Sequence, residues 1–297
     1  MKQVIAGTLI ILSLALNPGG AVPQTGAQAL ATQEEQARTL LKEGMDSKDY
    51  TVRVEAITAA GMIGVHEQVV QQLEGFLHDK DYQVRLAAIQ ALTDLEAPDS
   101  LEPLRQTLRQ DPTPEVAFAA AKALEKMHDP EGTQALREVF DGKRKASAGT
   151  IRKEERGFTS QFHSLPAAMM FMVSRGIGYV PLPGVGEGFS AVTKLLRDPQ
   201  FSDRAAVVLI LGQDKNPAAD DLLHQALKDE DWTVRAAAVQ IIAHTARMKW
   251  RDQLPPLFED KSHKVRFRAA GAFLHLALLQ YSEGKPKDSL KSGAKAQ

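Results

Sequence analysis

Apolar residues recur along this chain with the spacing of helices that bury one face. In segment 84–92, positions 84, 87, 88, 91 and 92 are apolar and fall at i, i+3, i+4, i+7 and i+8. That spacing places them on one face of an α-helix. A second apolar helix precedes each such segment, and Asp, Pro or Gly residues punctuate the joins. The pattern therefore predicts an all-α chain made of helix–turn–helix units.

The unit repeats at a period of about thirty residues. Val52, Val84 and Val116 are 32 residues apart, and the later arginines at 204, 235 and 266 are 31 apart. Two copies depart from the pattern, with Ala117 in place of the arginine and Asp203 in place of the valine. One helix pair cannot bury its apolar face alone, so several pairs must stack into a continuous core.

The motif Asp-x-x-Val-Arg-x-x-Ala-Ala-x-Ala-Leu, as it stands at residues 81–92, resembles HEAT repeats of the short bacterial kind that also occur in phycobilisome lyases. The resemblance covers about residues 34–140 and 187–281. It implies an all-α, right-handed α-α superhelix, a HEAT-like solenoid with a long concave surface. We expect repeats at 30–140 and 191–281, interrupted by one mid-chain insertion.

Arginines return at one position of the unit, and aspartates stand near the predicted helix starts. The set is Arg53, Arg85, Arg235 and Arg266, with Asp49, Asp81 and Asp231 four residues before the first three. An Asp at a helix start caps free N–H groups and suits the helix dipole. The following Arg can bridge to it or to the next repeat. An anion-binding strip is the alternative, but in HEAT-like proteins such residues staple neighbouring repeats, so we interpret them as a structural ladder.

An insertion at 141–190 interrupts the repeats, because 87 residues separate Val116 from Asp203 where one unit would take 31 or 32. It begins with basic residues and continues with apolar, methionine-rich and glycine-rich stretches. Insertions in repeat arrays often project from the binding face. The alternatives are a buried plug, a partner-binding element and a contact with a membrane surface. Candidate partner-binding residues are Arg144, Lys145, Arg152, Met170, Phe171, Tyr179 and Phe189.

The first 29 residues have the pattern of a secretory signal peptide and linker. Lys2 precedes an uncharged apolar run at 4–16, which Pro18 and two glycines end. The run is too short to cross a bilayer, and small residues precede cuts after Ala21 or Ala29. We therefore expect an exported protein, either periplasmic or secreted. The polar, lysine-rich residues 282–297 predict a disordered tail.

Composition limits the chemistry. The chain has 297 residues, a net charge of −1 and no cysteine, which excludes disulfides, thiolate nucleophiles and Cys-ligated metals. Its eight histidines form no metal-binding motif, and no cofactor is assigned. The balanced charge argues against nucleic acid.

The sequence thus favours a non-enzymatic exported scaffold. It would bind a protein partner through the concave face and the insertion. A lyase-like enzyme of the phycobilin-lyase type is one alternative, which the export signal argues against. A peripheral membrane protein that binds through the insertion is the other.

Overall fold

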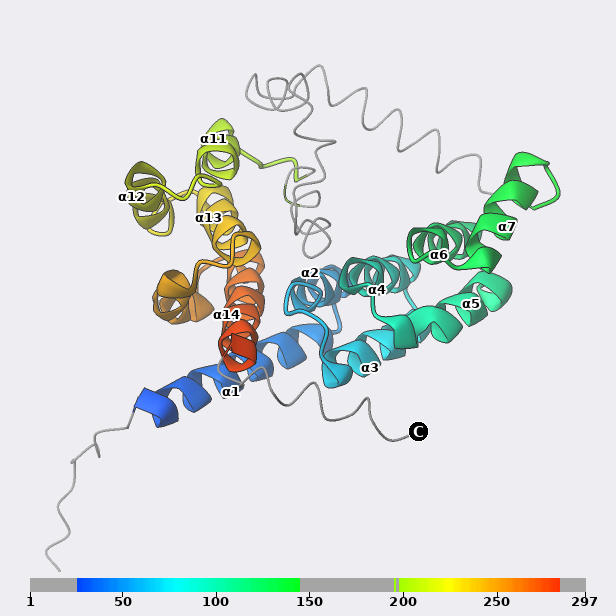
Figure 1. Cartoon of the computed structure of the whole chain (residues 1–297), viewed down its shortest axis with the longest axis horizontal. Helices are drawn as coiled ribbons and strands as arrows, with labels where there is room; N and C mark the ends of the chain where they lie inside the picture. Colours follow the sequence, from blue (N-terminus) through cyan, green and yellow to red (C-terminus); the bar gives the residue numbers. More distant parts are fainter. Residues whose placement is uncertain (1–25, 145–194, 196–197, 284–297) are drawn as a thin grey trace, which may run out of the picture.

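The computed structural model describes residues 26–144, 195 and 198–283, and every regular element in these ranges is a helix (Figure 1). The α-helices are α1 (Gly26–Met45), α2 (Tyr50–Ala60), α3 (Glu67–Gly75), α4 (Tyr82–Leu95), α5 (Leu101–Gln110), α6 (Pro114–Lys126), α7 (Pro130–Phe140), α11 (Asp203–Leu211), α12 (Pro217–Ala226), α13 (Trp232–His244) and α14 (His263–Glu283). Short 3₁₀ helices are η1 (Phe76–His78), η2 (Pro98–Ser100), η3 (Met248–Gln253) and η4 (Pro255–Glu259). The predicted all-α fold is confirmed.

Polar side chains and prolines start these helices. The Asp49 carboxylate accepts a hydrogen bond from the Thr51 backbone N–H at 2.8 Å, and the Asn216 side chain accepts one from Ala219 at 2.8 Å. Pro130 stands in the first turn of α7, where its missing N–H costs nothing. Capping of this kind satisfies N–H groups that have no partner inside the helix. The predicted joins therefore fall between helices: Asp129 and Pro130 start α7, whereas Asp79 and Asp111 follow the end of the preceding helix.

The helices form two rows. α2, α4 and α6 lie side by side, as do α11, α13 and α14, and together these six make an inner row (Figure 1). The outer row contains α1, α3, α5, α7 and α12, with η3 and η4 in the place of one helix (Figure 1). The inner row lines the inside of a bend in the stack. We call the side of these six helices that faces away from the outer row the inner surface.

The last repeat packs on the first. α14 contacts α2 and α1 of the N-terminal repeats as well as its chain neighbours α13 and η4. A Cβ atom on Gly271 of α14 would lie 2.4 Å from the carbonyl oxygen of Ala59 in α2, and one on Gly44 would lie 2.6 Å from the Phe267 ring. Only glycine permits such close approaches. Because α14 has neighbours on several sides, most of its residues between Val265 and Ala277 are buried.

Polar contacts also cross this junction between α14 and the N-terminal repeats. Arg268 forms a buried ion pair with Glu55 at 3.3 Å. The His275 ring donates from Nδ1 to the Ile63 carbonyl oxygen at 3.0 Å. Each contact joins residues more than 200 positions apart in sequence. The junction is therefore a specific interface between the two ends of the chain.

The stack is consequently continuous in space although the repeats are interrupted in sequence. The predicted groups 30–140 and 191–281 meet through α14, α1 and α2 and form one array. The chain leaves the array after α7 at one end and returns before α11 at the other (Figure 1). The first group begins at Gly26, four residues before its predicted start, and α14 ends at Glu283. The signal peptide, most of the insertion and the tail beyond Glu283 lie outside the described residues.

Candidate functional site: the inner surface and the arginine ladder

Three of the four ladder arginines, Arg53, Arg85 and Arg235, bind an aspartate of the next repeat in the stack. Arg85 donates from Nε and Nη2 to the two carboxylate oxygens of Asp111, at 2.7 and 3.0 Å. Arg235 binds Asp260 in the same way, at 2.6 and 2.7 Å. Bidentate pairs of this geometry are strong and directional. The ladder predicted from sequence therefore connects neighbouring repeats.

The same arginines also hold the turn before their own helix. Arg53 donates from Nη1 to the carbonyl oxygens of Ser47 and Lys48, at 2.9 and 3.2 Å. Its Nε and Nη2 atoms bind Asp79 at 3.1 and 3.0 Å, and Nη2 also reaches Asp81 at 2.6 Å. One guanidinium thus fixes a turn, a helix start and the next repeat. A buried arginine whose Nε, Nη1 and Nη2 atoms all donate hydrogen bonds within the protein has a structural role.

The aspartates divide into two kinds. Asp49 and Asp231 cap α2 and α13, whereas the Asp81 carboxylate accepts from Arg53. Hydrogen bonds from Thr51 hold the pKa of Asp49 below its ordinary value. The bidentate bond to Asp260 raises the pKa of the Arg235 guanidinium above its ordinary value. Both groups stay charged because the charged form makes the bonds.

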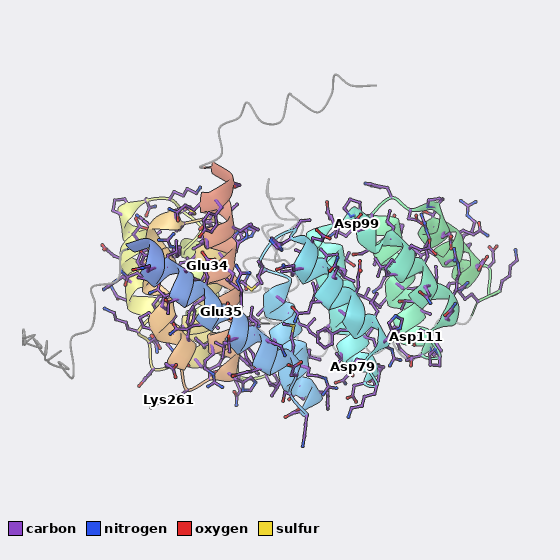
Figure 2. All side chains as sticks on the ribbon, turned by 90° about the horizontal axis from the view of Figure 1, so that it is seen from below. Glu34, Glu35, Asp79, Asp99, Asp111 and Lys261 are labelled. Carbon is purple, nitrogen blue, oxygen red and sulfur yellow. The ribbon has the colours of Figure 1, made fainter. Side chains whose placement is uncertain are left out.

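Sequence reasoning identified the arginines but missed their main partners. The partners are Asp79, Asp111 and Asp260, which lie 25 or 26 residues after the arginines that they bind. Each lies two residues before a helix cap, and one of its oxygens accepts the N–H of that cap residue. That recurring position was the available signal. Figure 2 shows Asp79 and Asp111 along one edge of the stack, with Lys261 further along the same edge.

Arg266 completes the predicted set but differs from the others. It donates from Nη1 to the Asp260 carbonyl oxygen at 2.8 Å, which is the bond that holds its own turn. Among the described residues no carboxylate pairs with it. The ladder is therefore incomplete where α14 meets α2.

The inner surface exposes polar side chains on α4 and α6. The sides of α4 that meet α2, α6 and η1 are buried, and its remaining side exposes Gln90. On α6, Lys122 is exposed and its ammonium lies 5.3 Å from the centroid of the Phe118 ring. The Arg268–Glu55 pair lies at the junction between the two halves. The described part of this surface is therefore neither strongly basic nor strongly acidic.

Of the insertion residues singled out by sequence, only Arg144 is described. It donates from Nη1 to the Leu108 carbonyl oxygen at 3.2 Å and from Nε to Glu138 at 3.2 Å. These bonds fasten the chain to α5 and α7 where it leaves the array. Arg144 therefore has a structural role, and its role in partner binding stays a prediction. The remaining candidates lie outside the described residues: Lys145, Arg152, Met170, Phe171, Tyr179 and Phe189.

Two concave regions flank α1 in the outer row. A cavity of about 290 Å³ lies between α1, α3 and α14, with Glu34, Arg38 and Tyr281 at its polar side. An open groove of about 820 Å³ separates α1 from η4, where short 3₁₀ helices stand in the place of a full outer helix. Figure 2 shows Glu34 and Glu35 on α1, next to these two regions.

The described ranges contain no helix that is both long and apolar enough to cross a bilayer. Within the same ranges, no three His, Cys, Asp or Glu side chains gather in a way that could hold a metal ion.

Comparison with known families identifies the repeat. A family model of HEAT repeats matches residues 11–92, 70–148 and 189–272, which is most of the chain. The chain belongs to the HEAT-repeat family. The matches leave out residues 149–188, which fall within the predicted insertion. No curated protein matches the sequence. This HEAT-repeat protein is thus a helical repeat scaffold.

Proposed function

We propose that this protein is a non-catalytic scaffold that binds another protein along the inner surface of its HEAT-repeat stack. One observation carries the proposal: α14 packs on α2, so the inner helices of both halves form one continuous row. Within that row α4 and α6 expose side chains such as Gln90 and Lys122, whereas residues 236–243 of α13 and 267–277 of α14 are buried. Helical solenoids bind partners along extended surfaces of this kind. The exposed side chains Gln90 and Lys122 supply one cation and no basic stripe, which suits a protein better than a polyanion.

The insertion 141–190 is part of the proposed binding element. The chain leaves the array after α7 and returns before α11, so this segment is tied to both ends of the inner surface (Figure 1). A partner seated on the inner row would therefore lie between the two attachment points. The apolar and methionine-rich composition of the segment suits an adaptable contact.

Site-specific photo-crosslinking tests the proposed surface. A benzoylphenylalanine placed at Gln90 or at Lys122 should form the same protein adduct, identified by mass spectrometry in the native host. The matched control is Gln106, an exposed residue of equal chemistry to Gln90 on the outer helix α5. We expect adduct yields about tenfold lower there. Equal or greater yield from position 106 would place the binding surface elsewhere.

We also propose that the chain is exported and that its signal peptide is cut after Ala21. A cut after Ala29 would remove the first four residues of α1, whereas a cut after Ala21 leaves the helix whole. Mass spectrometry of the protein from a periplasmic or culture fraction should therefore find Val22 at the N-terminus. Ile10→Arg, which breaks the apolar run at 4–16, should keep the chain uncut in the cytoplasm. Cytoplasmic protein that retains residues 1–21 would refute export.

A further inference from the structure

The ladder contains a repeated carboxylate slot. In each turn, one oxygen of the aspartate accepts the N–H of the residue two positions later, as Asp79 does from Asp81 at 2.8 Å. Both oxygens of the carboxylate also accept hydrogen bonds from the guanidinium of the preceding repeat. The turn at Asp260 repeats this arrangement, with the Ser262 N–H at 2.8 Å and Arg235 on the carboxylate. The slot therefore needs a side chain with two oxygens.

Where the last repeat meets the first, the slot holds no carboxylate. Ser47 occupies the position of the slot aspartate, and its single Oγ accepts the Asp49 N–H at 3.2 Å. The serine thus forms the turn but offers no second oxygen to an arginine. Arg266 has the orientation of the other ladder arginines, because its Nη1 binds the carbonyl six residues earlier, as in Arg53 and Arg85. Its Nε and Nη2 atoms bind no acceptor among the described residues.

Other charges around this vacancy favour an anion. Lys48 follows Ser47 directly, and Lys261 lies in the turn before α14; both are exposed and neither forms an ion pair with a described residue. Of the acids in these turns, Asp49 caps α2 through Thr51, Asp260 is engaged by Arg235 and Asp46 by Lys42. Glu259 is exposed and forms no ion pair with a described residue. Burial lowers the pKa of His263 at the start of α14, and the charges of Glu55 and Arg266 act on that pKa in opposite directions. One guanidinium and two ammonium groups therefore lack a carboxylate partner within the described ranges.

We propose that Arg266, with Lys48 and Lys261, binds an acidic segment of a partner protein whose carboxylate fills the slot that Ser47 leaves open. Arg53 shows how a complete slot is filled, since it holds the two carboxylates of an Asp-x-Asp sequence, Asp79 and Asp81. At Arg266 the place of Asp81 is already taken by Asp49 of this chain, so the partner segment supplies the one carboxylate that Ser47 lacks. The site lies on the edge formed by the turns, apart from the inner surface, so it is independent of the binding surface proposed above.

A short peptide that copies the occupied slot tests the proposal. The probe is acetyl-Asp-Lys-Asp-Tyr-amide, the sequence of residues 79–82. Titrated into the ¹⁵N-arginine-labelled full chain, it should shift the Nε–Hε signal of Arg266 with saturation. The Asn-Lys-Asn-Tyr peptide, which lacks both carboxylates, should bind at least about tenfold more weakly. The signal is assigned by its loss in Arg266→Gln.

Two variants separate a built site from a free arginine. Ser47→Asp supplies the missing carboxylate from within the chain, so it should raise the melting temperature and abolish peptide binding. Arg137 on α7 is exposed and has no carboxylate partner among the described residues, so its Nε–Hε signal should not respond. Equal shifts at Arg137 and Arg266, or undiminished binding by Ser47→Asp, would overturn the proposal. In Ser47→Asp a carboxylate oxygen can take over the bond from the Asp49 N–H, as in Asp79, and an undiminished melting temperature would show that the fold is intact.

Discussion

Gly271→Ala should lower the free energy of unfolding by about 2 to 3 kcal/mol, because the new methyl group has no space. A Cβ at this position would lie 2.4 Å from the Ala59 carbonyl oxygen and 3.1 Å from its carbonyl carbon. Both obstacles are backbone atoms of a buried helix, so they cannot move aside as a flexible side chain would. α14 and α2 must separate instead, and this contact joins the two halves of the array. Urea unfolding followed by circular dichroism measures the loss.

The matched control is Gly75→Ala, the same substitution in another helix. A Cβ on Gly75 meets nothing within 4 Å, and alanine favours helix over glycine by up to about 1 kcal/mol. This variant should be as stable as the parent or slightly more so. Hydrogen exchange adds a local readout, since Gly271→Ala should speed exchange in α2 and α14 before it does so in α6. Equal losses in the two variants would show that the junction is not a tight contact.

The sequence predicts the repeats well because each carries its own signals. The apolar spacing around Val84, the capping residues Asp49 and Asp231 and the helix-starting Pro130 all act within one unit. Such local signals need no knowledge of the neighbouring repeat. For the same reason, the arginines of the ladder were predicted from the sequence and their aspartate partners were not. Its arginines recur at a fixed place, whereas the acceptor Asp111 lies 26 residues from Arg85.

The packing of α14 on α1 and α2, which joins the two groups of repeats, was not predicted. Repeats of this kind can stack on one another in more than one order. Ala59 and Ala91 are small residues that accept an adjacent helix, and nothing near either specifies which helix it will be. Because the repeats were counted in chain order, the prediction placed the insertion in the middle of the array. In the structure the chain leaves the array at one end, after α7, and returns at the other, before α11 (Figure 1). The available clues were Gly44 and Gly271, glycines inside helices, where a close approach by another segment is one of the few benefits of glycine. Specificity comes from contacts such as Arg268–Glu55, which only the folded chain assembles.

Arg85→Ala should lower the free energy of unfolding by about 3 kcal/mol, because it leaves a buried carboxylate without its cation. The Asp111 side chain is only 5% exposed, and Arg85 supplies two of its hydrogen bonds. The substitution also releases the carbonyl oxygen of Asp79, which Arg85 holds at 2.9 Å. For a protein of this size the loss corresponds to a melting temperature lower by about 6 to 12 °C. Differential scanning calorimetry measures it directly.

A double-mutant cycle isolates the contribution of the pair. Asp111→Ala alone should also destabilise, and the double variant Arg85→Ala/Asp111→Ala should lose less than the sum of the two single losses, because no charge is then left buried. The control is Lys42→Ala, whose partner Asp46 is largely exposed, as is Lys42 itself. Water already solvates both of those charges, so this variant should melt as the parent does. Strict additivity in the cycle would mean that Arg85 acts only through its own turn, and that the ladder does not couple one repeat to the next.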